Sequence, residues 1–496
     1  MQHSAALPFP FTSGVLGAFL AATALVPSAQ AQEAAPQPSA SADRALIEQL
    51  VERIARLEGE VASLRAAPPA PVAPVPALAR REESPPPPEV QDKPQDKGLL
   101  GFHSGNSSVV LSGYVKLLMT TARYSGGNDP TGTLGRDVYV PQSIPVYNPA
   151  SPTSPTRVTD IAAKQTRFWV DADTHLGQHT LKGYIEMDFQ AAPGTPMALG
   201  QGTQRTTNAY DLAMRRAYVQ FDRWLFGQDF STFAETSIMP ESTDYLGAID
   251  GLVFVRQPQV RYTLPLGRGV KLNLAVENPE TASATLVPDA TTHAVSASLI
   301  ENGEDHAPDV AARVDYAGGF GQIYLAGLLR QLRVDNAGAG AAHVVDDRMG
   351  WGISTAGKIL LGHKGADWRF QATWGSGIGR YLGLNFGPDA VLTTNGRLGE
   401  VRNLGLYSAL HVPLNPQWRV NLLGSFQHIY YASSLDHGAT GVGGYNAQAW
   451  SAAGNLFYSP VSNVDFGVEY RHGERALVDG LHGSVDRLDF AAKYAF

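Results

Sequence analysis

Apolar and polar side chains alternate along most of residues 108–496. In the segment 167–174, Phe168, Val170 and Ala172 fall on one face, and the positions between them are mostly charged. The same alternation recurs in the segments 269–277, 368–374 and 464–471. A strict period of two over about eight to ten residues predicts a strand with one apolar face. Clusters of Gly, Asn, Asp and Pro separate these strands, and their spacing predicts about sixteen of them, an even number as bacterial barrels require.

Two features favour a transmembrane antiparallel β-barrel over a soluble β-sandwich. Charged residues recur on the non-apolar face of nearly every predicted strand, which suits a water-filled lumen. The predicted connections also alternate between short turns and long loops, as they do in outer-membrane barrels. The short ones are Gly177-Gln178, Gly318-Gly319 and Pro413 to Pro416, and the long ones are 125–164, 192–209 and 232–257. The expected fold class is therefore all-β, and a barrel of this size encloses an aqueous channel.

The N-terminal segment predicts export. Residues 1–31 contain no Asp, Glu, Lys or Arg, and an apolar stretch from Phe11 to Val26 precedes Ala29-Gln30-Ala31. Small residues in that spacing are what a signal peptidase accepts, so we interpret residues 1–31 as a signal peptide. An N-terminal membrane anchor is the alternative, but the stretch is short for one. Beyond Ala31 no apolar run reaches the length of about 18 residues that a membrane helix needs, so a membrane passage has to use strands.

After a flexible tail at 32–42, residues 43–65 predict a coiled-coil helix with a heptad seam. The seam consists of Ile47, Leu50, Ile54, Leu57, Val61 and Leu64. β-Branched residues at a with Leu at d favour two strands. Against that, Arg53 and Glu58 resemble a trimerisation pattern in which Arg and Glu form a salt bridge between neighbouring chains. A charged surface face is the other interpretation of these two residues, so the heptads alone leave dimer and trimer open. Residues 66–107 are rich in proline and predict an extended linker.

The composition and the short motifs argue against several classes of function. The chain has no cysteine, which excludes a disulfide scaffold, a thiolate metal site and a cysteine nucleophile. The net charge is −8, so no overall basic excess argues for nucleic acid. His175 and His179 have the spacing of a helical metal pair but flank a predicted turn, and residues 375–379 lack the Gly-Lys-Ser/Thr of a phosphate loop. We therefore expect no enzyme, no metal and no cofactor.

The last predicted strand ends on an aromatic residue. Leu488, Phe490, Ala492, Tyr494 and Phe496 share one face. This resembles the signal by which the barrel-assembly machinery recognises its clients, with Phe490, Tyr494 and Phe496 as the signal residues. The assembly machinery and the outer-membrane lipid, including lipopolysaccharide, are thus expected partners.

The order of signal peptide, coiled coil, Pro-rich linker and barrel resembles the DcaP-like trimeric porins, within the general porins of Gram-negative bacteria. The sequence likeness is carried by residues 214–221, 224–233 and 256–263, which look like that family's central strands and the strand after its long loop. The resemblance implies a homotrimer with a periplasmic coiled coil and passive diffusion of small, preferably anionic solutes such as dicarboxylates. A non-conducting barrel with a structural or surface-interaction role is the alternative.

Strand alternation places six basic side chains toward the lumen: Lys116, Arg167, Arg216, Arg261, Arg313 and Arg330. An arginine facing lipid near the midplane would cost about 2–4 kcal/mol, so the lumen is the favoured side. In general porins the third loop folds inward, and here the loop at 232–257 carries Glu235, Glu241, Asp244 and Asp250. We expect this set to line a constriction in which a basic wall faces an acidic loop. The simpler alternative for each arginine is a solvated lumen charge without a selective role.

Arg215 cannot share a face with Arg216 in a regular strand, so it indicates a bulge, a subunit contact or the membrane edge.

Aromatic residues near strand ends are typical of the girdles at the two membrane interfaces. The candidates are Tyr114, Trp169, Tyr184, Trp224, Tyr262, Trp418, Tyr470 and Tyr494.

Overall fold

The computed structural model describes residues 100–129, 133–190, 208, 210–285, 299–300, 305–335, 343–362, 365–437 and 441–496. The predicted signal peptide, the tail at 32–42 and the heptad residues from Ile47 to Leu64 lie outside these residues. Of the linker predicted at 66–107, only residues 100–107 are described, and they already belong to the sheet. The sheet therefore begins before the predicted boundary at Ser108.

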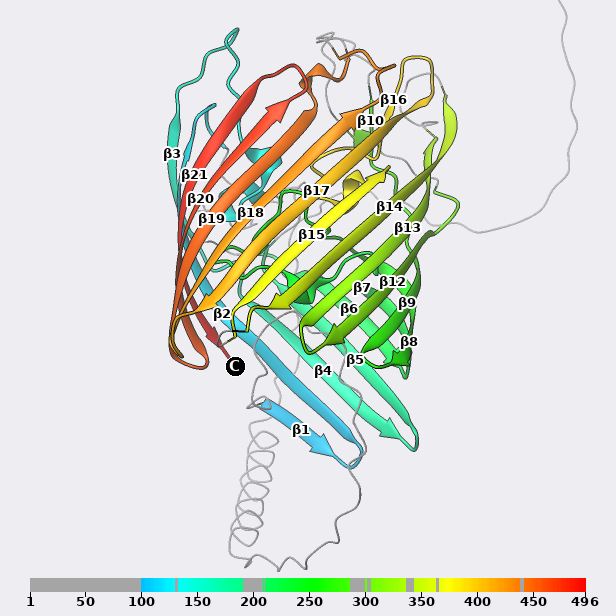
Figure 1. The fold of residues 1–496 in the computed structure, drawn as a ribbon, viewed down its shortest axis with the longest axis vertical. Coiled ribbons are helices and arrows are strands. Elements are labelled where there is room, and N and C mark those ends of the chain that lie inside the picture. Colours follow the sequence, from blue (N-terminus) through cyan, green and yellow to red (C-terminus); the bar gives the residue numbers. More distant parts are fainter. Residues whose placement is uncertain are drawn as a thin grey trace, which may run out of the picture. The chain divides into compact units, whose positions relative to one another are not determined.

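The strands close into one antiparallel barrel of sixteen strands (Figure 1), as the spacing predicted. β3 and β4 count as one barrel strand because both pair with β2, each over a different part of it. The ring closes where β21 pairs with β2. In chain order the barrel strands are β2 (Ser107–Tyr124), β3 (Thr156–Ala162) with β4 (Arg167–Leu176), β5 (His179–Asp188), β6 (Ala213–Phe221), β7 (Trp224–Phe230), β8 (Arg256–Gly267), β9 (Val270–Glu277), β12 (Asp309–Gly318), β13 (Gly321–Asp335), β14 (Val345–Leu360), β15 (Asp367–Ser376), β17 (Leu398–Pro413), β18 (Trp418–Tyr431), β19 (Asn446–Val461), β20 (Val464–Leu477) and β21 (His482–Ala495).

The remaining elements are short. β1 (Leu100–Ser104) pairs with β2 just beyond the point where β21 ends. β10 (Ser283–Thr285), β11 (Leu299–Ile300) and β16 (Ala390–Leu392) form a small sheet that joins the start of β17. The helical turns are α2 (Leu134–Asp137), η1 (Pro141–Ser143), η2 (Thr236–Ile238), η3 (Gly379–Tyr381) and η4 (Val442–Gly444). Within the described ranges, no helix is long and apolar enough to cross a membrane.

Because side chains alternate along each strand, the barrel wall has an apolar outer face and a more polar inner face. On β2, Val115, Leu117 and Met119 point outward and are exposed, whereas Lys116 and Leu118 between them are buried toward the inside. Exposed apolar side chains recur on the outer face of most strands. Such a continuous apolar band is favourable against lipid and unfavourable in water. The outer face is therefore built for a membrane.

Short turns and long loops lie at opposite ends of the barrel (Figure 1), as predicted. Gly177 and Gln178 form the turn between β4 and β5, and Gly177 has a φ of +66°, which glycine adopts without strain. The turn after β17 covers residues 414–417 and so lies one residue later than predicted. The loop predicted at 125–164 is also shorter, because β3 forms within it.

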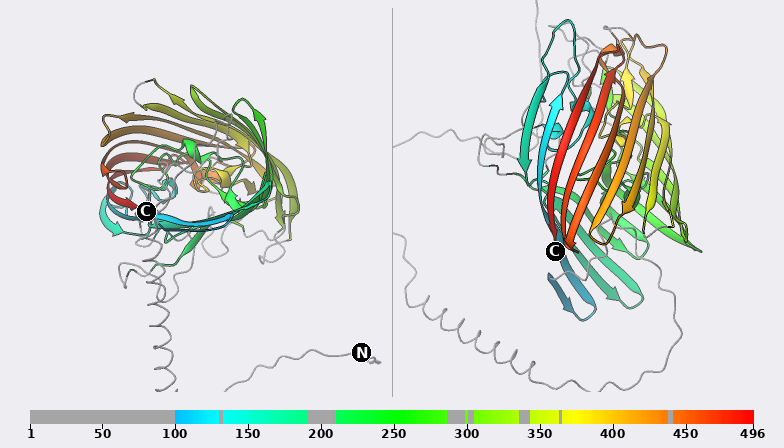
Figure 2. Two further views of the ribbon diagram at one scale, coloured as in Figure 1. Left: turned by 90° about the horizontal axis from the view of Figure 1, so that it is seen from below. Right: turned by 60° about the vertical axis from the view of Figure 1, so that its left-hand side comes forward.

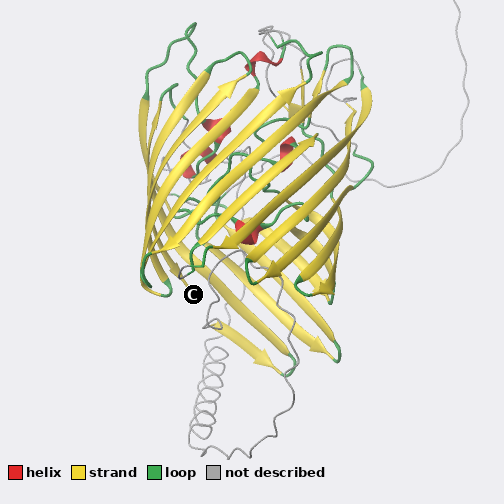
Figure 3. Cartoon of the chain, in the orientation of Figure 1, coloured by secondary structure: helices red, strands yellow, loops and turns green. Residues whose placement is uncertain are grey.

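The connection between β7 and β8, residues 231–255, folds into the barrel, and we call it the inward loop. Figure 2 (left) shows segments crossing the inside of the ring, and Figure 3 shows short helical turns within the outline of the wall. Phe233, Ile249 and Leu252 of the inward loop are buried against lumen-facing residues of β12 to β19. A hydrophobic core therefore sits inside the barrel, along one part of its wall.

Candidate functional site

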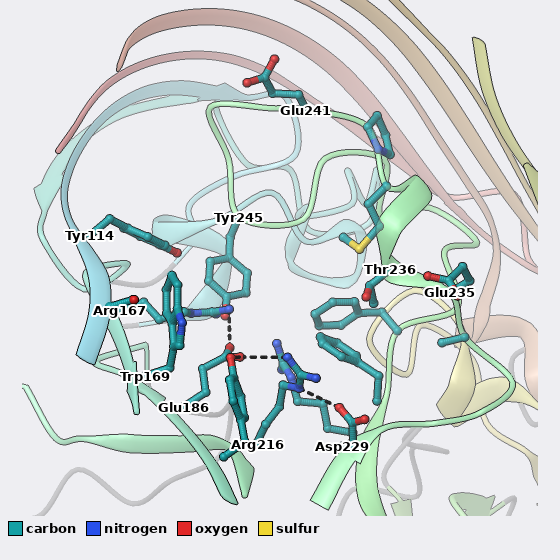
Figure 4. Close-up of a pocket in the computed structure, with 18 of the residues that line it drawn as sticks. Tyr114, Arg167, Trp169, Glu186, Arg216, Asp229, Glu235, Thr236, Glu241 and Tyr245 are labelled. Carbon is teal, nitrogen blue, oxygen red and sulfur yellow. Dashed lines mark hydrogen bonds and ion pairs between the residues drawn. The ribbon is translucent and has the colours of Figure 1, made fainter. Parts of the chain in front are cut away.

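A cavity of about 1170 Å³ lies between the inward loop and the wall formed by β2 and β4 to β9. It is larger than the usual pocket for one small molecule. The wall supplies charged and aromatic side chains, and the inward loop supplies Glu235, Glu241 and Tyr245 among others (Figure 4). Strands β12 to β21 contribute fewer residues, such as Arg313 and Arg419.

Three of the predicted arginines form one ion-pair network on the wall. Arg167 contacts Glu186 at 2.6 Å and Asp188 at 2.8 Å. Arg216 contacts Asp229 at 2.6 Å and Glu186 at 3.4 Å (Figure 4), and Arg261 contacts Asp229 at 2.8 Å. The partners are therefore carboxylates of neighbouring strands and not those of the inward loop.

Sequence analysis did not single out Glu186, Asp188 or Asp229. Glu186 lies between the outward Ile185 and Met187, so the alternation already placed it inside. Asp229 follows from the alternation of β7 in the same way. The alternation of β5 and β7 therefore indicates that these carboxylates face the lumen, as it does for the arginines.

Arg215 reaches the same network through a bulge. The pairing of β5 with β6 shifts between Glu186, which faces Arg216, and Met187, which faces Met214. Arg215 is the extra residue, and its side chain contacts Asp188 at 2.6 Å. A bulge lets two consecutive side chains point to the same side of a sheet. Of the three interpretations of Arg215, the bulge is correct.

Several guanidinium groups of the cavity wall lie over aromatic rings. The Arg216 guanidinium lies 4.7 Å from the ring centre of Tyr184, and that of Arg256 lies 4.4 Å from Phe230 and 4.8 Å from Phe254. Such contacts stabilise a cation and limit its movement. Tyr114, Trp169 and Tyr184 line the cavity, so their prediction as girdle residues was wrong, whereas Trp224, Tyr470 and Tyr494 are exposed on the outer face.

The carboxylates of the inward loop are bound to arginines on the other part of the wall. Glu235 contacts Arg313 at 2.9 Å, and Glu241 contacts Arg419 at 2.6 Å. Burial alone would raise the pKa of Glu241, but hydrogen bonds from Arg419 outweigh it and the pKa is lowered. Glu241 therefore remains charged, and the two ion pairs together fix the inward loop to the wall.

Asp244 is the loop carboxylate beside the cavity without an ion pair among the described residues. Its Oδ2 accepts a hydrogen bond from the backbone N–H of Tyr139 at 2.6 Å. Burial raises the pKa of Asp244 to about 6, against the opposing effect of Arg487. The charge at this position consequently depends on pH near neutrality.

Two predicted pore residues do not line the cavity. Arg330 is 2% exposed and contacts Asp309 at 3.3 Å and Asp389 at 3.0 Å. Asp250 is fully buried and accepts hydrogen bonds from Ser425 at 2.6 Å and from Tyr139 at 3.0 Å. Both lie inside the barrel, where Arg330 of the wall binds a loop and Asp250 of the inward loop binds the wall, and neither meets solvent.

The cavity lining holds more positive than negative side chains, with twelve Lys or Arg against ten Asp or Glu. Lys116, Arg256 and Lys271 have no ion pair with a carboxylate among the described residues. Lys116 donates to the backbone oxygen of Thr243 at 2.8 Å, and the Nε atom of Arg256 is buried without a hydrogen bond. These three cations all belong to the β2–β9 wall, and sequence analysis named only Lys116.

The remaining candidates lie elsewhere. His179 contacts Asp222 at 2.7 Å on the outside of a turn, and the described residues hold no group of three or more His, Cys, Asp or Glu that could bind a metal. Phe490 and Tyr494 are exposed on the outer face of β21. The backbone of Phe496 pairs with Gly113 of β2, so the last residue helps to close the ring.

Comparison with known proteins decides the family. The model of the DcaP outer membrane protein family matches residues 135–496. The chain belongs to this family. The outer membrane channel DcaP of Acinetobacter baumannii has a similar structure, with a TM-score of 0.59 and 22% identity over 80% of this chain and all of that one.

Two further porins show weaker likeness. OmpT of Vibrio cholerae has a TM-score of 0.47 and 11% identity over 80% of this chain and 99% of that one. The anion-selective porin from Comamonas acidovorans has a TM-score of 0.46 and 11% identity over 79% of this chain and all of that one. The search of curated proteins finds no match. Membership of the DcaP family establishes an outer-membrane channel of the porin type, which is not an enzyme.

Proposed function

We propose that the channel lets small hydrophilic solutes diffuse passively across the outer membrane with a preference for anions such as dicarboxylates. The observation that carries this proposal is the set of unpaired cations, Lys116, Arg256 and Lys271, on the wall of the cavity. A cation already bound to a carboxylate offers little net charge to a solute. An unpaired one raises the local concentration of anions and lowers that of cations.

The paired arginines support the same proposal in a different way. Arg216 is held by Asp229 and by the rings around it, so its planar guanidinium group has a fixed orientation. A fixed fork of N–H donors suits a carboxylate geometrically. Binding in a channel has to be weak enough for release, and neutralising partners such as Asp229 keep it so.

The direct test is the reversal potential of the reconstituted channel in a KCl gradient. We expect an anion-selective sign for the unchanged protein and a shift toward cations in Arg256→Gln. Arg223→Gln is the matched control, because Arg223 lies in the turn after β6 and outside the cavity. A reversal potential that is equal in all three proteins would contradict the role of Arg256.

A second pair of variants tests the predicted constriction. Replacing Arg216 and Arg261 with Gln should also reduce anion preference, because each change removes one positive charge from the cavity wall. Selectivity that stays unchanged in both variants would remove these two residues from the proposed pathway. A barrel that conducts no ions at all would favour the non-conducting, structural alternative.

We further propose a homotrimer whose chains associate through the heptads at 43–65. The support is the seam of Ile47, Leu50, Ile54, Leu57, Val61 and Leu64, with Arg53 and Glu58 beside it. Native mass spectrometry of the full chain gives the subunit number. Glu58→Lys should weaken a trimer held by the Arg53–Glu58 contact, and Glu60→Lys is the control on a neighbouring position.

A further inference from the structure

Two arginines stand side by side on the outer face of the barrel near its long-loop end. Arg123 of β2 and Arg157 of β3 are direct cross-strand partners, and both are exposed. Their neighbours Ala122, Tyr124 and Val158 pack on the inside, so the two guanidinium groups point outward. Like charges directly opposite each other on one face of a sheet are destabilising. An anion bound between the two guanidinium groups would offset this repulsion.

The charge of Asp486 on β21 interacts with that of Arg123, but no described carboxylate lies within ion-pair distance of either guanidinium group. Neither Arg123 nor Arg157 forms a hydrogen bond or an ion pair with another described residue. Asp486 lies opposite Arg123 on β21, but its Oδ1 accepts hydrogen bonds from Tyr470 and His472, each at 2.8 Å. By contrast, the outward Arg402 of β17 contacts Glu400 at 3.1 Å.

The next two outward pairs on the same strands complete a graded surface. Thr121 faces Thr159, and their hydroxyl oxygens are 3.2 Å apart. Met119 faces Ile161, and these side chains are 36% and 52% exposed. Successive outward pairs are spaced about 6.6 Å along a strand. The surface thus changes from cationic to hydroxylated to apolar within a short distance.

This change occurs at the height expected for the membrane surface. The apolar outer face of β2 runs from Val109 to Met119. That stretch covers about 35 Å of strand, and at a tilt of about 40° it spans roughly 25–30 Å, close to the apolar band of an outer-membrane barrel. The arginine pair lies just beyond the band at the long-loop end, which is the extracellular end in outer-membrane barrels.

We propose that Arg123 and Arg157 bind a phosphate group of an outer-leaflet glycolipid of the lipopolysaccharide type. The guanidinium forks hold the phosphate, Thr121 and Thr159 meet the hydroxylated sugar, and Met119 and Ile161 pack against the acyl chains. Each zone of the surface then meets the part of the lipid that matches it in polarity. The site is on the outer face, so it does not depend on the selectivity of the cavity.

The test uses the full chain in nanodiscs and measures the binding of lipid A with native mass spectrometry. The variants are Arg157→Gln alone and Arg123→Gln with Arg157→Gln, and Arg402→Gln is the control at an outward arginine that already has a carboxylate partner. We expect the double variant to bind bis-phosphorylated lipid A at least about tenfold more weakly than the unchanged protein, and the single variant to lie between them. Dephosphorylated lipid A should bind all four proteins equally.

Three results would overturn the proposal. Undiminished binding of phosphorylated lipid A by both variants would remove the arginines from the lipid site. Full competition by inorganic phosphate at the same concentration would indicate a site for free anions. Loss of the oligomer in the double variant, with lipid binding unchanged, would assign the pair to a contact between copies of this chain.

Discussion

The lumen face of the barrel has two regions with the same alternating sequence and different structures. On β2 and β4 to β9, inward residues such as Arg216 and Lys271 reach the cavity. On β12 to β19, inward residues such as Ala311, Leu328 and Ala453 are buried beneath the inward loop. The first region is a charged surface that lines the cavity. The second is a hydrophobic core that also forms hydrogen bonds with the inward loop.

A side chain that faces the lumen therefore does not always line the pore. Arg216 and Arg330 both point inward from a strand, yet Arg216 borders the cavity and Arg330 is buried between Asp309 and Asp389. Alternation gives the direction of a side chain. The path of the loops decides whether that side chain meets solvent.

Replacing Arg330 should have the largest effect on stability. Arg330→Met removes the ion-pair partner of the buried Asp389 and leaves Asp309 with only the more distant Arg380, at 3.8 Å. Breaking a buried ion pair in this way costs about 3–5 kcal/mol. We expect the free energy of unfolding, measured by guanidinium titration, to fall by that amount while the reversal potential stays unchanged. Arg402→Met, at an exposed ion pair, should change stability by less than about 1 kcal/mol. A stable Arg330→Met protein with altered selectivity would place Arg330 in the pore.

The contact between the inward loop and β17 offers a second comparison. A Cβ atom on Gly405 would lie 2.3 Å from the backbone oxygen of Gly251, so no larger residue fits there. We expect Gly405→Ala to lower the free energy of unfolding by about 1–3 kcal/mol and to increase fluctuations of the single-channel current, because the loop is pushed off the wall. Gly424→Ala on β18 is the control, since its nearest contact would be an ordinary 3.7 Å. Equal behaviour of the two variants would mean that the loop does not dock tightly.

Acidification should produce a smaller and reversible effect through Asp244. Its pKa is raised to about 6, so its carboxylate becomes neutral as the pH falls through 6. The cavity then loses a negative charge, and we expect anion selectivity to increase between pH 7 and pH 5. The raised pKa also means that the folded state binds the proton more tightly than the unfolded state does. The contribution of Asp244 to the free energy of unfolding is therefore greatest below pH 3.8 and falls as the pH rises to about 6. Asp244→Asn should show the low-pH selectivity at every pH, and an unchanged pH dependence in that variant would exclude Asp244 as its cause.

Much of the fold follows from the sequence because a strand exposes alternate residues to lipid and to the lumen. That rule predicted the sixteen strands, the two kinds of connection and the inward direction of the arginines. It did not predict the core inside the barrel. The segment from Ile323 to Leu329 is apolar on both faces, and such a continuous run indicates a strand that is covered on both sides.

The ion pairs of the site could be predicted less well than its wall. Partners such as Asp229 and Arg261 are brought together by strand register, which depends on the lengths of turns and on the bulge at Arg215. The ion pairs of Glu235 and Glu241 depend on where the inward loop lies. Contacts with residues far away in the sequence set the position of such an irregular loop, so its own sequence does not predict these pairs. The signal peptide and the coiled coil stay predictions, because they lie outside the described residues.

The most direct test of the two-region account uses the absence of cysteine from the natural chain. Thr263→Cys places a single thiol on the cavity wall, and Ala326→Cys places one on the lumen face of β13, where Ala326 is 1% exposed beneath the inward loop. We predict that charged methanethiosulfonate reagents reduce the current through Thr263→Cys, the anionic reagent faster than the cationic one, and leave Ala326→Cys unaffected. Equal modification of both variants, or faster reaction with the cationic reagent, would contradict the account.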